Sequence, residues 1–579
     1  MEECYNRKDC LPGETIKRIK KILRVNKIKV KESRVINLNN LIFSVRVELR
    51  GFNGIGTNGK GITKQYARAS AYAELMERIQ SRNLIKKDFL SKEFNDVNYI
   101  DEKYLSYDKF IEKFKRLDIL KERNVRELIK CNSQYRYYTT FYNTSKNKQE
   151  DLPIRLINLF SHSNGLCAGN SKEEALVQGI CEIFERYAYK KIMLEELSMP
   201  TIIVEDGQIK RIKNQLEQIK IMGYNYTIKD CSLSGNIPVV GLLIQDEERQ
   251  KYLFSIGSDP DFEIALQRCI TEIFQGISIS EVETKFKLMD NEYESKKDKY
   301  KEDFLQLNWL KCYASNNGIH SKNFFVKEKK VLLKYLPFQN IDNNKEALKC
   351  VLKVVKRNKL ELYIKDYSFL GFNTYKVYIP NISNVDVLDT IKLKVYSKYK
   401  DLKENYYSFL TLRGKDNYLF ESIFEELSNN IKYSTFIYPN NLFEVNNYIK
   451  NDYVGLNYFY LLIIELVLNK KYEKAIRIIE RKLDNQELDL FEREYLEYLR
   501  LRIVNGKMVY GKKYQKDIVR DVNQLLMKPE RYLKKLKISR CPDCKSCTNR
   551  RQCKYNKWIK LETKLQNNMK ICKKGENLK

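Results

Sequence analysis

Histidine, tryptophan and proline are scarce in this chain of 579 residues, which contains 2, 2 and 10 of them, respectively. Only His162 and His320 could serve as an imidazole base. This scarcity argues against Ser/His or Cys/His nucleophilic catalysis, because both mechanisms use such a base. The few prolines give no sign of an extended linker.

Long apolar segments are missing as well. The first residues, MEECYNRKDCLPGE, are charged and contain no apolar core of a signal peptide. No run of about 18 apolar residues occurs, so the sequence predicts no membrane-spanning helix. We therefore expect a soluble, cytoplasmic protein in which the 14 cysteines are mostly reduced thiols or metal ligands.

The charge balance is strongly basic. Lys and Arg number 106 against 75 Asp and Glu, which gives a formal net charge of +31. Such a charge attracts anionic partners, including RNA, ribosomes and ATP. The lysines are spread along the whole chain, however, and no cluster of Arg with aromatic residues stands out, so specific nucleic-acid binding is not predicted. The length and the 43% hydrophobic content predict two to four globular domains.

A phosphate-binding loop of the Walker type is also missing, although the sequence comes close to one. Gly54 is followed after four residues by Gly59 and Lys60. Gly61 then occupies the position of the Ser or Thr that the motif requires as a magnesium ligand. We therefore interpret this stretch as a glycine-rich turn and reject the P-loop.

Strands and helices alternate from residue 14 to about residue 380. The first elements are predicted as a helix at 14–26, strands at 34–39 and 42–49, and a long helix after the glycine-rich turn. This order is typical of an α/β or α+β body, whereas the helix-period pattern beyond about residue 385 predicts an all-α region. The expected domains are a nucleotide-binding body at 1–385, a connecting region at 386–440, a helical domain at 441–535 and a Cys-rich basic tail at 536–579.

The helical region contains one segment with a repeat-like pattern. Residues 470–483, KKYEKAIRIIERKL, resemble the second helix of a tetratricopeptide (TPR) unit, with Tyr472, Ala475 and Ile476 at the packing positions. One or two TPR-like units are predicted. An unrelated helical hairpin is the alternative.

Three predicted helices carry acidic residues on one narrow face among small or apolar neighbours. The residues on these faces are Glu74 and Glu77; Glu174, Gln178, Glu182 and Glu185; and Arg268, Glu272 and Gln275. On the first helix the spacing places Ala67, Ser70 and Ala71 on the stripe of the two glutamates, and Tyr66, Ala69, Ala73, Met76 and Ile79 on the opposing apolar face. Carboxylates in such surroundings are costly unless cations lie against them. Magnesium ions that also bind substrate phosphates would meet this need. The alternatives are a solvated helix face and, for Glu174, a capping box with Ser171.

These helices resemble three blocks of the YcaO family. The matching strings are TNGKGITKQYARASAYAELMER, SNGLCAGNSKEEALVQGICEIFERYA and DPDFEIALQRCITEIFQG, in the family's order. The resemblance covers about the first 380 residues and implies ATP binding through magnesium-holding carboxylates without a Walker motif. The nucleotide and magnesium residues that it implies are Lys8, Thr15, Glu74, Glu77, Asn170, Glu174, Glu182, Glu185, Arg186, Arg268 and Glu272.

The resemblance also implies a chemistry. Catalytic members use ATP to phosphorylate a peptide backbone amide, and azolines, thioamides or amidines result. Cyclodehydratase members commonly end in a proline-rich carboxylate tail, whereas this chain ends KGENLK, and no leader-peptide recognition domain is evident at its amino terminus. Length and layout instead resemble a member described as an accessory factor for β-methylthiolation of a small-subunit ribosomal protein.

Three functional hypotheses therefore stay open. The chain acts on a peptide or ribosomal protein as an amide-activating enzyme or accessory factor, or it forms azolines or thioamides in a natural-product pathway. The third hypothesis is a non-catalytic adaptor that recruits a sulfur-transfer, methylthiotransferase or ribosomal partner. The resemblance further implies a homodimer.

The tail contains a dense group of cysteines. Cys541, Cys544, Cys547 and Cys553 form a CxxCxxC run with one more cysteine after five residues, and Cys572 could add a fifth thiol. Thiolates at such spacing suit Zn²⁺ or an iron–sulfur cluster. A set of reduced thiols without metal is the alternative, because the spacing matches no familiar zinc finger.

Overall fold

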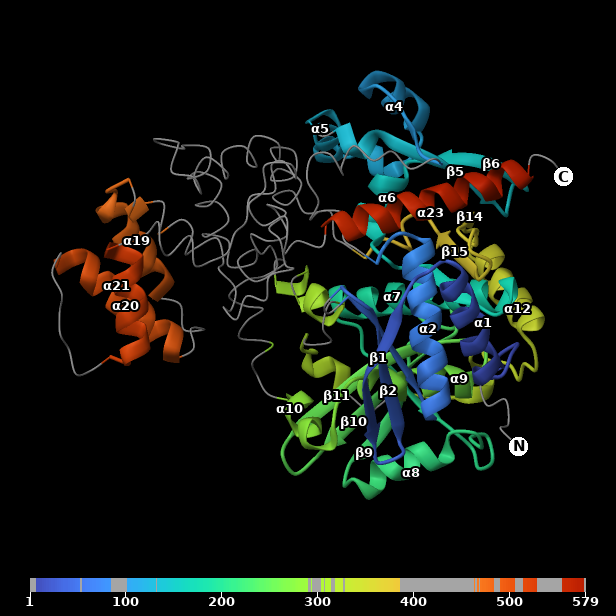
Figure 1. Ribbon diagram of the computed structural model, residues 1–579. Coiled ribbons are helices and arrows are strands. Elements are labelled where there is room, and N and C mark those ends of the chain that lie inside the picture. Colours follow the sequence, from blue (N-terminus) through green and yellow to red (C-terminus); the bar gives the residue numbers. More distant parts are fainter. Residues whose placement is uncertain are drawn as a thin grey trace.

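The computed structural model describes most of residues 7–385 and several pieces of the C-terminal part (Figure 1). The described part of 7–385 has gaps at 53–54, 85–100, 132, 290–292, 294–303, 307, 314–317 and 326–328. Beyond residue 385 the described residues are 463, 466–467, 469–483, 490–505, 514–527 and 555–576. The predicted connecting region at 386–440 and the four cysteines of the CxxCxxC run lie outside them, so both stay predictions.

The amino-terminal elements form a small antiparallel sheet with two helices packed beside it. Their bounds are α1 (Pro12–Val25), β1 (Val30–Leu38), β2 (Ile42–Leu49), β3 (Gly56–Gly61) and α2 (Lys64–Gln80). The strand order is β1-β2-β3. The predicted helix at 14–26 and the predicted strand at 42–49 are confirmed.

The predicted glycine-rich turn is wrong, because residues 56–61 form strand β3. Its glycines allow helix α2 to approach the strand closely. A Cβ atom at Gly59 would lie 2.1 Å from the carbonyl oxygen of Ala67, and one at Gly61 would lie 2.7 Å from the backbone nitrogen of Ala67. The glycines of the near-Walker sequence therefore serve helix–strand packing.

Two larger, mainly antiparallel sheets complete the body. The first has the order β12-β11-β10-β9-β8-β13, in which only β8 and β13 pair in parallel. Its strands are β8 (Thr201–Ile203), β9 (Asn225–Asp230), β10 (Val239–Asp246), β11 (Lys251–Ser258), β12 (Lys287–Leu288) and β13 (Lys330–Leu332). The second sheet has the order β4-β5-β14-β15-β7, with β6 paired to β5. Its strands are β4 (Lys103–Tyr104), β5 (Tyr137–Asn143), β6 (Lys148–Leu152), β7 (Leu166–Gly169), β14 (Tyr363–Asp366) and β15 (Asn373–Tyr378).

Helix α7 lies between the two larger sheets and carries much of the core. Its apolar residues share one hydrophobic cluster with Val239 and Phe254 of the first sheet and with Cys167 and Val377 of the second. The body is therefore of the mixed α/β type that the sequence predicts. The helices around these sheets are α4 (Tyr107–Phe114), α5 (Arg123–Cys131), α6 (Ile154–Ser161), α7 (Lys172–Leu194), α8 (Lys213–Ile221), α9 (Phe262–Ile273), α10 (Val282–Lys285) and α12 (Asn344–Arg357).

His320, one of the two histidines of the chain, is buried in this core and has a structural role. Its Nδ1 atom lies 3.0 Å from the hydroxyl of Tyr252, and its Nε2 atom lies 3.3 Å from the hydroxyl of Tyr189. Burial, aided by the nearby ammonium group of Lys287, lowers the pKa of His320 well below its usual value. The imidazole is thus a neutral packing group and not a catalytic base.

We expect acid to destabilise the protein through His320. Because the folded-state pKa is depressed, the stabilisation is complete above the unfolded pKa near about 6.5 and is lost as the pH falls below it. Going from about pH 7.5 to about pH 5.5 should cost about 1.4 kcal/mol through this group. Urea unfolding followed by tryptophan fluorescence checks this, with His320→Asn as the variant that lacks the contribution. An equal loss in the variant would contradict the prediction.

The described C-terminal helices are α19 (Tyr472–Leu483), α20 (Leu490–Asn505), α21 (Lys516–Met527) and α23 (Tyr555–Glu576). Helix α19 confirms a helix at the repeat-like segment, and Ala475 is buried there as predicted. Tyr472, predicted to pack against a neighbour, is 44% exposed. The TPR-like assignment therefore stays a prediction.

Helix α23 packs against the body, which the sequence pattern does not predict (Figure 1). Its Leu565 joins the hydrophobic cluster of α1 and α2. Its Glu562 lies 3.5 Å from the guanidinium of Arg82, just beyond the end of α2. Helix α23 thus supports α2 from the side.

Among the residues that the structure describes, none of the helices has the length and hydrophobicity that a membrane span requires.

Candidate functional site

A cavity of about 410 Å³ lies where residues 7–15, which we call the amino-terminal segment, meet α2, β3, α7 and α9. We call it the carboxylate cavity. Every residue that the sequence predicts for the nucleotide and magnesium site lines it: Lys8, Thr15, Glu74, Glu77, Asn170, Glu174, Glu182, Glu185, Arg186, Arg268 and Glu272. Residues from four separate segments of the chain, around residues 8–15, 74–77, 170–186 and 268–272, are therefore brought together.

The carboxylates of α2 and α7 interact with one another in this cavity. Burial raises the pKa of Glu77 to about 8, and the negative charges of Glu74 and Glu182 add to the rise. Burial likewise raises the pKa of Glu182, with a further contribution from Glu185. Buried like charges of this kind disfavour ionisation. A cation bound between the two helices would reverse that effect and keep the carboxylates ionised.

The α2 residues that line the cavity differ in part from the predicted stripe. The pattern places Ala67 and Ala71 beside Glu74 and Glu77, with Ala69 and Ala73 on the opposite face. In the structure Ala69, Ser70 and Ala73 line the carboxylate cavity. Ala67 and Ala71 instead contact the backbone of β3 at its glycines. The predicted stripe was wrong in this respect. The helical period of 3.6 residues groups side chains into faces, but it does not decide which of two neighbouring faces lines the cavity.

Arginines compensate part of the negative charge. Arg78 reaches both α2 carboxylates, with its Nη2 atom 3.4 Å from Glu74 and its Nε atom 3.5 Å from Glu77. The Nε atom of Arg186 lies 3.9 Å from Glu185, on the same helix. Arg268 also lines the cavity. Arg78 was missed by the sequence reasoning, although its spacing of four from Glu74 could have identified it.

Lys60 is the most informative residue that the sequence reasoning missed. Strand residues alternate between faces, so Gly59 and Gly61 face α2 while Asn58 and Lys60 face the carboxylate cavity. The Lys60 ammonium forms an ion pair with Glu272 of α9. Burial lowers the pKa of Lys60 to about 8, against the opposing effect of Glu185. The lysine of the near-Walker sequence thus lies in the candidate site through a strand and not a loop.

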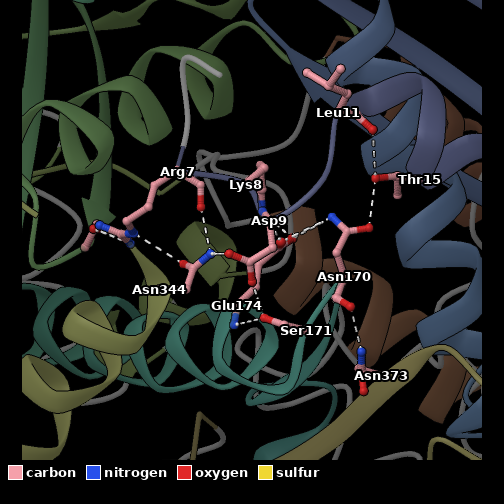
Figure 2. Close-up of polar contacts among 11 residues, drawn as sticks. Arg7, Lys8, Asp9, Leu11, Thr15, Asn170, Ser171, Glu174, Asn344 and Asn373 are labelled. Carbon is pink, nitrogen blue, oxygen red and sulfur yellow. Dashed lines mark hydrogen bonds and ion pairs between the residues drawn. The ribbon is translucent and has the colours of Figure 1, made fainter. Parts of the chain in front are cut away.

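The amino-terminal segment lines the carboxylate cavity, and Figure 2 shows its polar contacts with Asn170, Ser171, Glu174 and Asn344. Glu174 accepts hydrogen bonds from Lys8 Nζ at 3.1 Å and from the backbone nitrogen of Asp9 at 3.0 Å. The hydroxyl of Ser171 caps α7 by accepting from the backbone nitrogen of Glu174 at 3.0 Å. The Glu174 carboxylate does not return to Ser171, so the capping box considered from the sequence is wrong. Despite burial, Lys8 and the other donors lower the pKa of Glu174.

Further contacts hold this segment in place. Thr15 donates from its hydroxyl to Asn170 Oδ1 at 2.8 Å. Arg7 donates from Nη2 to both carboxylate oxygens of Asp259 at 3.0 Å. Asn344 of α12 donates to the carbonyl oxygen of Arg7 at 2.7 Å (Figure 2). Arg7, Asp259 and Asn344 were also missed, because partners more than 200 residues apart leave no local pattern.

The donor set fits magnesium bound together with phosphates. Among the described residues, no three His, Cys, Asp or Glu side chains converge to form a complete metal site by themselves. Magnesium is commonly held by one or two carboxylates plus substrate phosphate oxygens and water. The two carboxylate pairs of α2 and α7 match that pattern. The cations of Lys60, Arg186 and Arg268 could contact the remaining phosphate oxygens.

A family model described as YcaO cyclodehydratase, ATP- and Mg²⁺-binding, matches residues 58–383. The chain is 24% identical over 434 residues to the ribosomal protein S12 methylthiotransferase accessory factor YcaO of Escherichia coli (strain K12), covering 71% of this chain and 72% of that protein. It is also 24% identical over 409 residues to an uncharacterised protein of Haemophilus influenzae, covering 66% of this chain and 67% of that protein.

Solved structures resemble the chain more distantly. A structure of YcaO from Methanopyrus kandleri bound with AMPPCP and Mg²⁺ superposes with a TM-score of 0.43 and 17% identity, covering 66% of this chain and 94% of that one. A heterocyclase in complex with substrate and cofactor gives a TM-score of 0.44 and 16% identity. That match covers 65% of this chain and 53% of the heterocyclase, so the chain spans about half of its length.

Proposed function

The chain belongs to the YcaO family, and on this premise we propose that it binds ATP with Mg²⁺ in the carboxylate cavity and phosphorylates a peptide backbone amide. The observation that carries the proposal is the meeting of the α2 and α7 glutamates in one cavity. Burial, with a further contribution from neighbouring glutamates, raises the pKa values of Glu77 and Glu182, and a divalent cation bound beside them would stabilise their ionised forms.

The residues divide into three groups under this proposal. Glu74, Glu77, Glu182 and Glu185 would hold the magnesium ions, which neutralise phosphate charge when bound. The amino-terminal segment would contact the nucleotide through Lys8 and Thr15. These two residues are hydrogen-bonded to Glu174 and Asn170, respectively. Lys60, Arg186 and Arg268 would face the phosphates as fixed cations. Phosphoryl transfer depends mainly on such positioning and charge.

The proposed reaction consumes ATP and an acceptor amide. The amide oxygen forms a bond to the γ-phosphorus, and the bond from that phosphorus to the oxygen bridging to the β-phosphate breaks, releasing ADP. The amide oxygen becomes a phosphate ester and hence a good leaving group. A nucleophile then adds to the amide carbon and phosphate departs. The identity of that nucleophile decides between an azoline, a thioamide and an amidine.

A second candidate is an accessory role in ribosomal protein modification. The E. coli relative supports it, because it is named an accessory factor for an S12 methylthiotransferase and matches 71% of this chain. An adaptor of this kind would use nucleotide binding to control a partner and would not transfer phosphate to an acceptor. The helices beyond residue 463 are the parts of the chain that such a partner could recognise.

Calorimetry and phosphate release on the purified full chain test the proposal. We expect a non-hydrolysable ATP analogue to bind in the presence of Mg²⁺ and to lose at least about 100-fold in affinity when the metal is chelated, because the phosphates would then face uncompensated glutamates. ATP hydrolysis should show the same metal dependence. Equal binding with and without Mg²⁺ would contradict the proposal. Binding without any hydrolysis or acceptor phosphorylation would favour the adaptor role.

A further inference from the structure

A second cavity, of about 640 Å³, adjoins the carboxylate cavity. Its size lies within the range of about 300–1,000 Å³ that is usual for ligand pockets. The two cavities have six lining residues in common: Asn58, Glu185, Arg186, Ile256, Glu272 and Gln275. A ligand in the second cavity would therefore reach the carboxylates and cations of the proposed phosphate site.

One wall of the second cavity is a single face of the amino-terminal sheet. Strand pairing aligns Arg34, Arg46 and Asn58 in one row across the sheet. The next row on the same face contains Ile36, Ser44 and Lys60. In each row the first two residues line the second cavity, and the third residue lines the carboxylate cavity. The sheet thus forms a continuous floor that connects the two.

The other lining residues include aromatic and polar side chains. Among them are Tyr189 of α7, Ser255 of β11, and Cys312 and Tyr313. The guanidinium of Arg186 lies 5.4 Å from the ring centroid of Tyr313. Burial raises the pKa of the Cys312 thiol, which is therefore not an activated nucleophile. A wall with this mixture of flat rings and hydrogen-bonding groups suits a peptide, which presents apolar side chains and backbone amides together.

The charges in the second cavity are separated. Its carboxylates, Glu185 and Glu272, belong to the wall shared with the carboxylate cavity. Arg46 donates hydrogen bonds to Glu48 at 2.8 Å and to the shared lining residue Asn58 at 2.9 Å. Arg34 is exposed and makes no hydrogen bond or ion pair with any residue that the structure describes. Hydrogen bonds from Ser278, with a smaller contribution from Arg34, lower the pKa of Glu281, so this exposed carboxylate lies near Arg34 without forming an ion pair with it. The end far from the proposed phosphate site therefore presents a guanidinium that no ion pair holds among the described residues.

We propose that the second cavity receives the acceptor peptide and that Arg34 selects peptides with an acidic side chain near the modified amide. The inference rests on the proposed function, since it places the acceptor beside the transferring phosphoryl group. The amide oxygen would enter through the shared wall at Glu185, Arg186 and Glu272. An acidic side chain of the peptide that lies farther along the sheet from the modified amide would accept a charge-assisted hydrogen bond from Arg34.

Two labelled random copolymers test the proposal on the full chain with Mg²⁺ and a non-hydrolysable ATP analogue. One contains Glu, Ala and Tyr, and the other contains Lys, Ala and Tyr. We expect the Glu copolymer to bind and the Lys copolymer to bind at least about tenfold more weakly. Arg34→Glu should weaken binding of the Glu copolymer about tenfold, and Ile36→Trp, which fills the cavity beside it, should do the same. Affinity for the ATP analogue should change less than about twofold in both variants, because neither residue lines the carboxylate cavity.

Lys213→Glu is the matched control, because it makes the same charge change on α8 at a site that lines neither cavity. The net charge of +31 attracts any polyanion, so the control should lose little. An equal loss in Lys213→Glu and Arg34→Glu, equal binding of both copolymers, or no binding of the Glu copolymer would overturn the inference while nucleotide binding stands. Absence of nucleotide binding in the wild-type protein would instead overturn the proposed function, and this inference with it.

Discussion

Glu182→Gln is expected to lower kcat/KM for Mg²⁺-dependent ATP hydrolysis by about 1,000-fold or more. Glu182 lies in the middle of α7 and lines the carboxylate cavity together with Glu185. Under the proposed function it holds magnesium, so the amide variant loses a metal ligand and the negative charge that draws the metal. Loss of a single ligand weakens both metal binding and the charge stabilisation of phosphoryl transfer.

The thermal stability of Glu182→Gln distinguishes the loss of a metal ligand from misfolding as the cause of lower ATP hydrolysis. The pKa of Glu182 is raised by burial, which means that its surroundings disfavour the carboxylate. Without nucleotide, Glu182→Gln should therefore melt at the wild-type temperature or above it, as measured by thermal unfolding. Glu195→Gln is the control at the end of the same helix, because Glu195 is the exposed C-cap of α7 and pairs with the half-buried Lys191. Wild-type activity in Glu182→Gln would exclude the metal role proposed for this residue.

The acidic helices could be predicted because the information they carry is local. Glu174, Gln178, Glu182 and Glu185 recur at helical spacing, and all four line the carboxylate cavity. The same argument placed Arg268 and Glu272 on α9 correctly. A helix exposes its pattern within two turns, so a narrow polar face among buried residues is visible without knowledge of its partners. What such a face binds is a separate question, which the spacing does not answer.

The contacts that complete the site could not be predicted, because they join distant segments. Arg7 meets Asp259 across 252 positions, and Lys8 meets Glu174 across 166. The docking of α23 through Glu562 and Arg82 spans a still larger separation. No local pattern encodes these pairs. The sheets that bring them together depend on the packing of α7 between two layers, which is a property of the whole body.

The glycine-rich stretch was misinterpreted for a different reason. Gly59 and Gly61 indicate a close backbone approach, and a turn around a phosphate is only one structure that needs it. A strand packed against a helix of small residues needs it equally, and Ala67 and Ala71 follow in the sequence. Once β3 is recognised as a strand, its period of two places Lys60 opposite the helix, on the face that lines the carboxylate cavity.

Lys60→Met is expected to reduce the rate of phosphoryl transfer by about 100- to 1,000-fold. The variant removes a fixed ammonium from the wall of the carboxylate cavity while keeping the approximate length of the side chain. It also leaves Glu272 without its ion-pair partner in the described structure, so the negative charge of the site increases where the phosphates would bind. Single-turnover measurements with ATP give the transfer rate, and titration of the ATP analogue gives the affinity.

The comparison of lysine variants distinguishes charge at this position from general loss of basic residues. Lys64→Met removes an exposed lysine at the start of α2 and should leave both quantities unchanged within about twofold, because Lys64 does not line either cavity. Lys60→Arg keeps the charge and should retain more activity than Lys60→Met, although its planar group cannot reproduce the ammonium geometry. If Lys60→Met transfers phosphate within about threefold of the wild-type rate, Lys60 serves only to neutralise Glu272 and the catalytic cations must be Arg186 and Arg268.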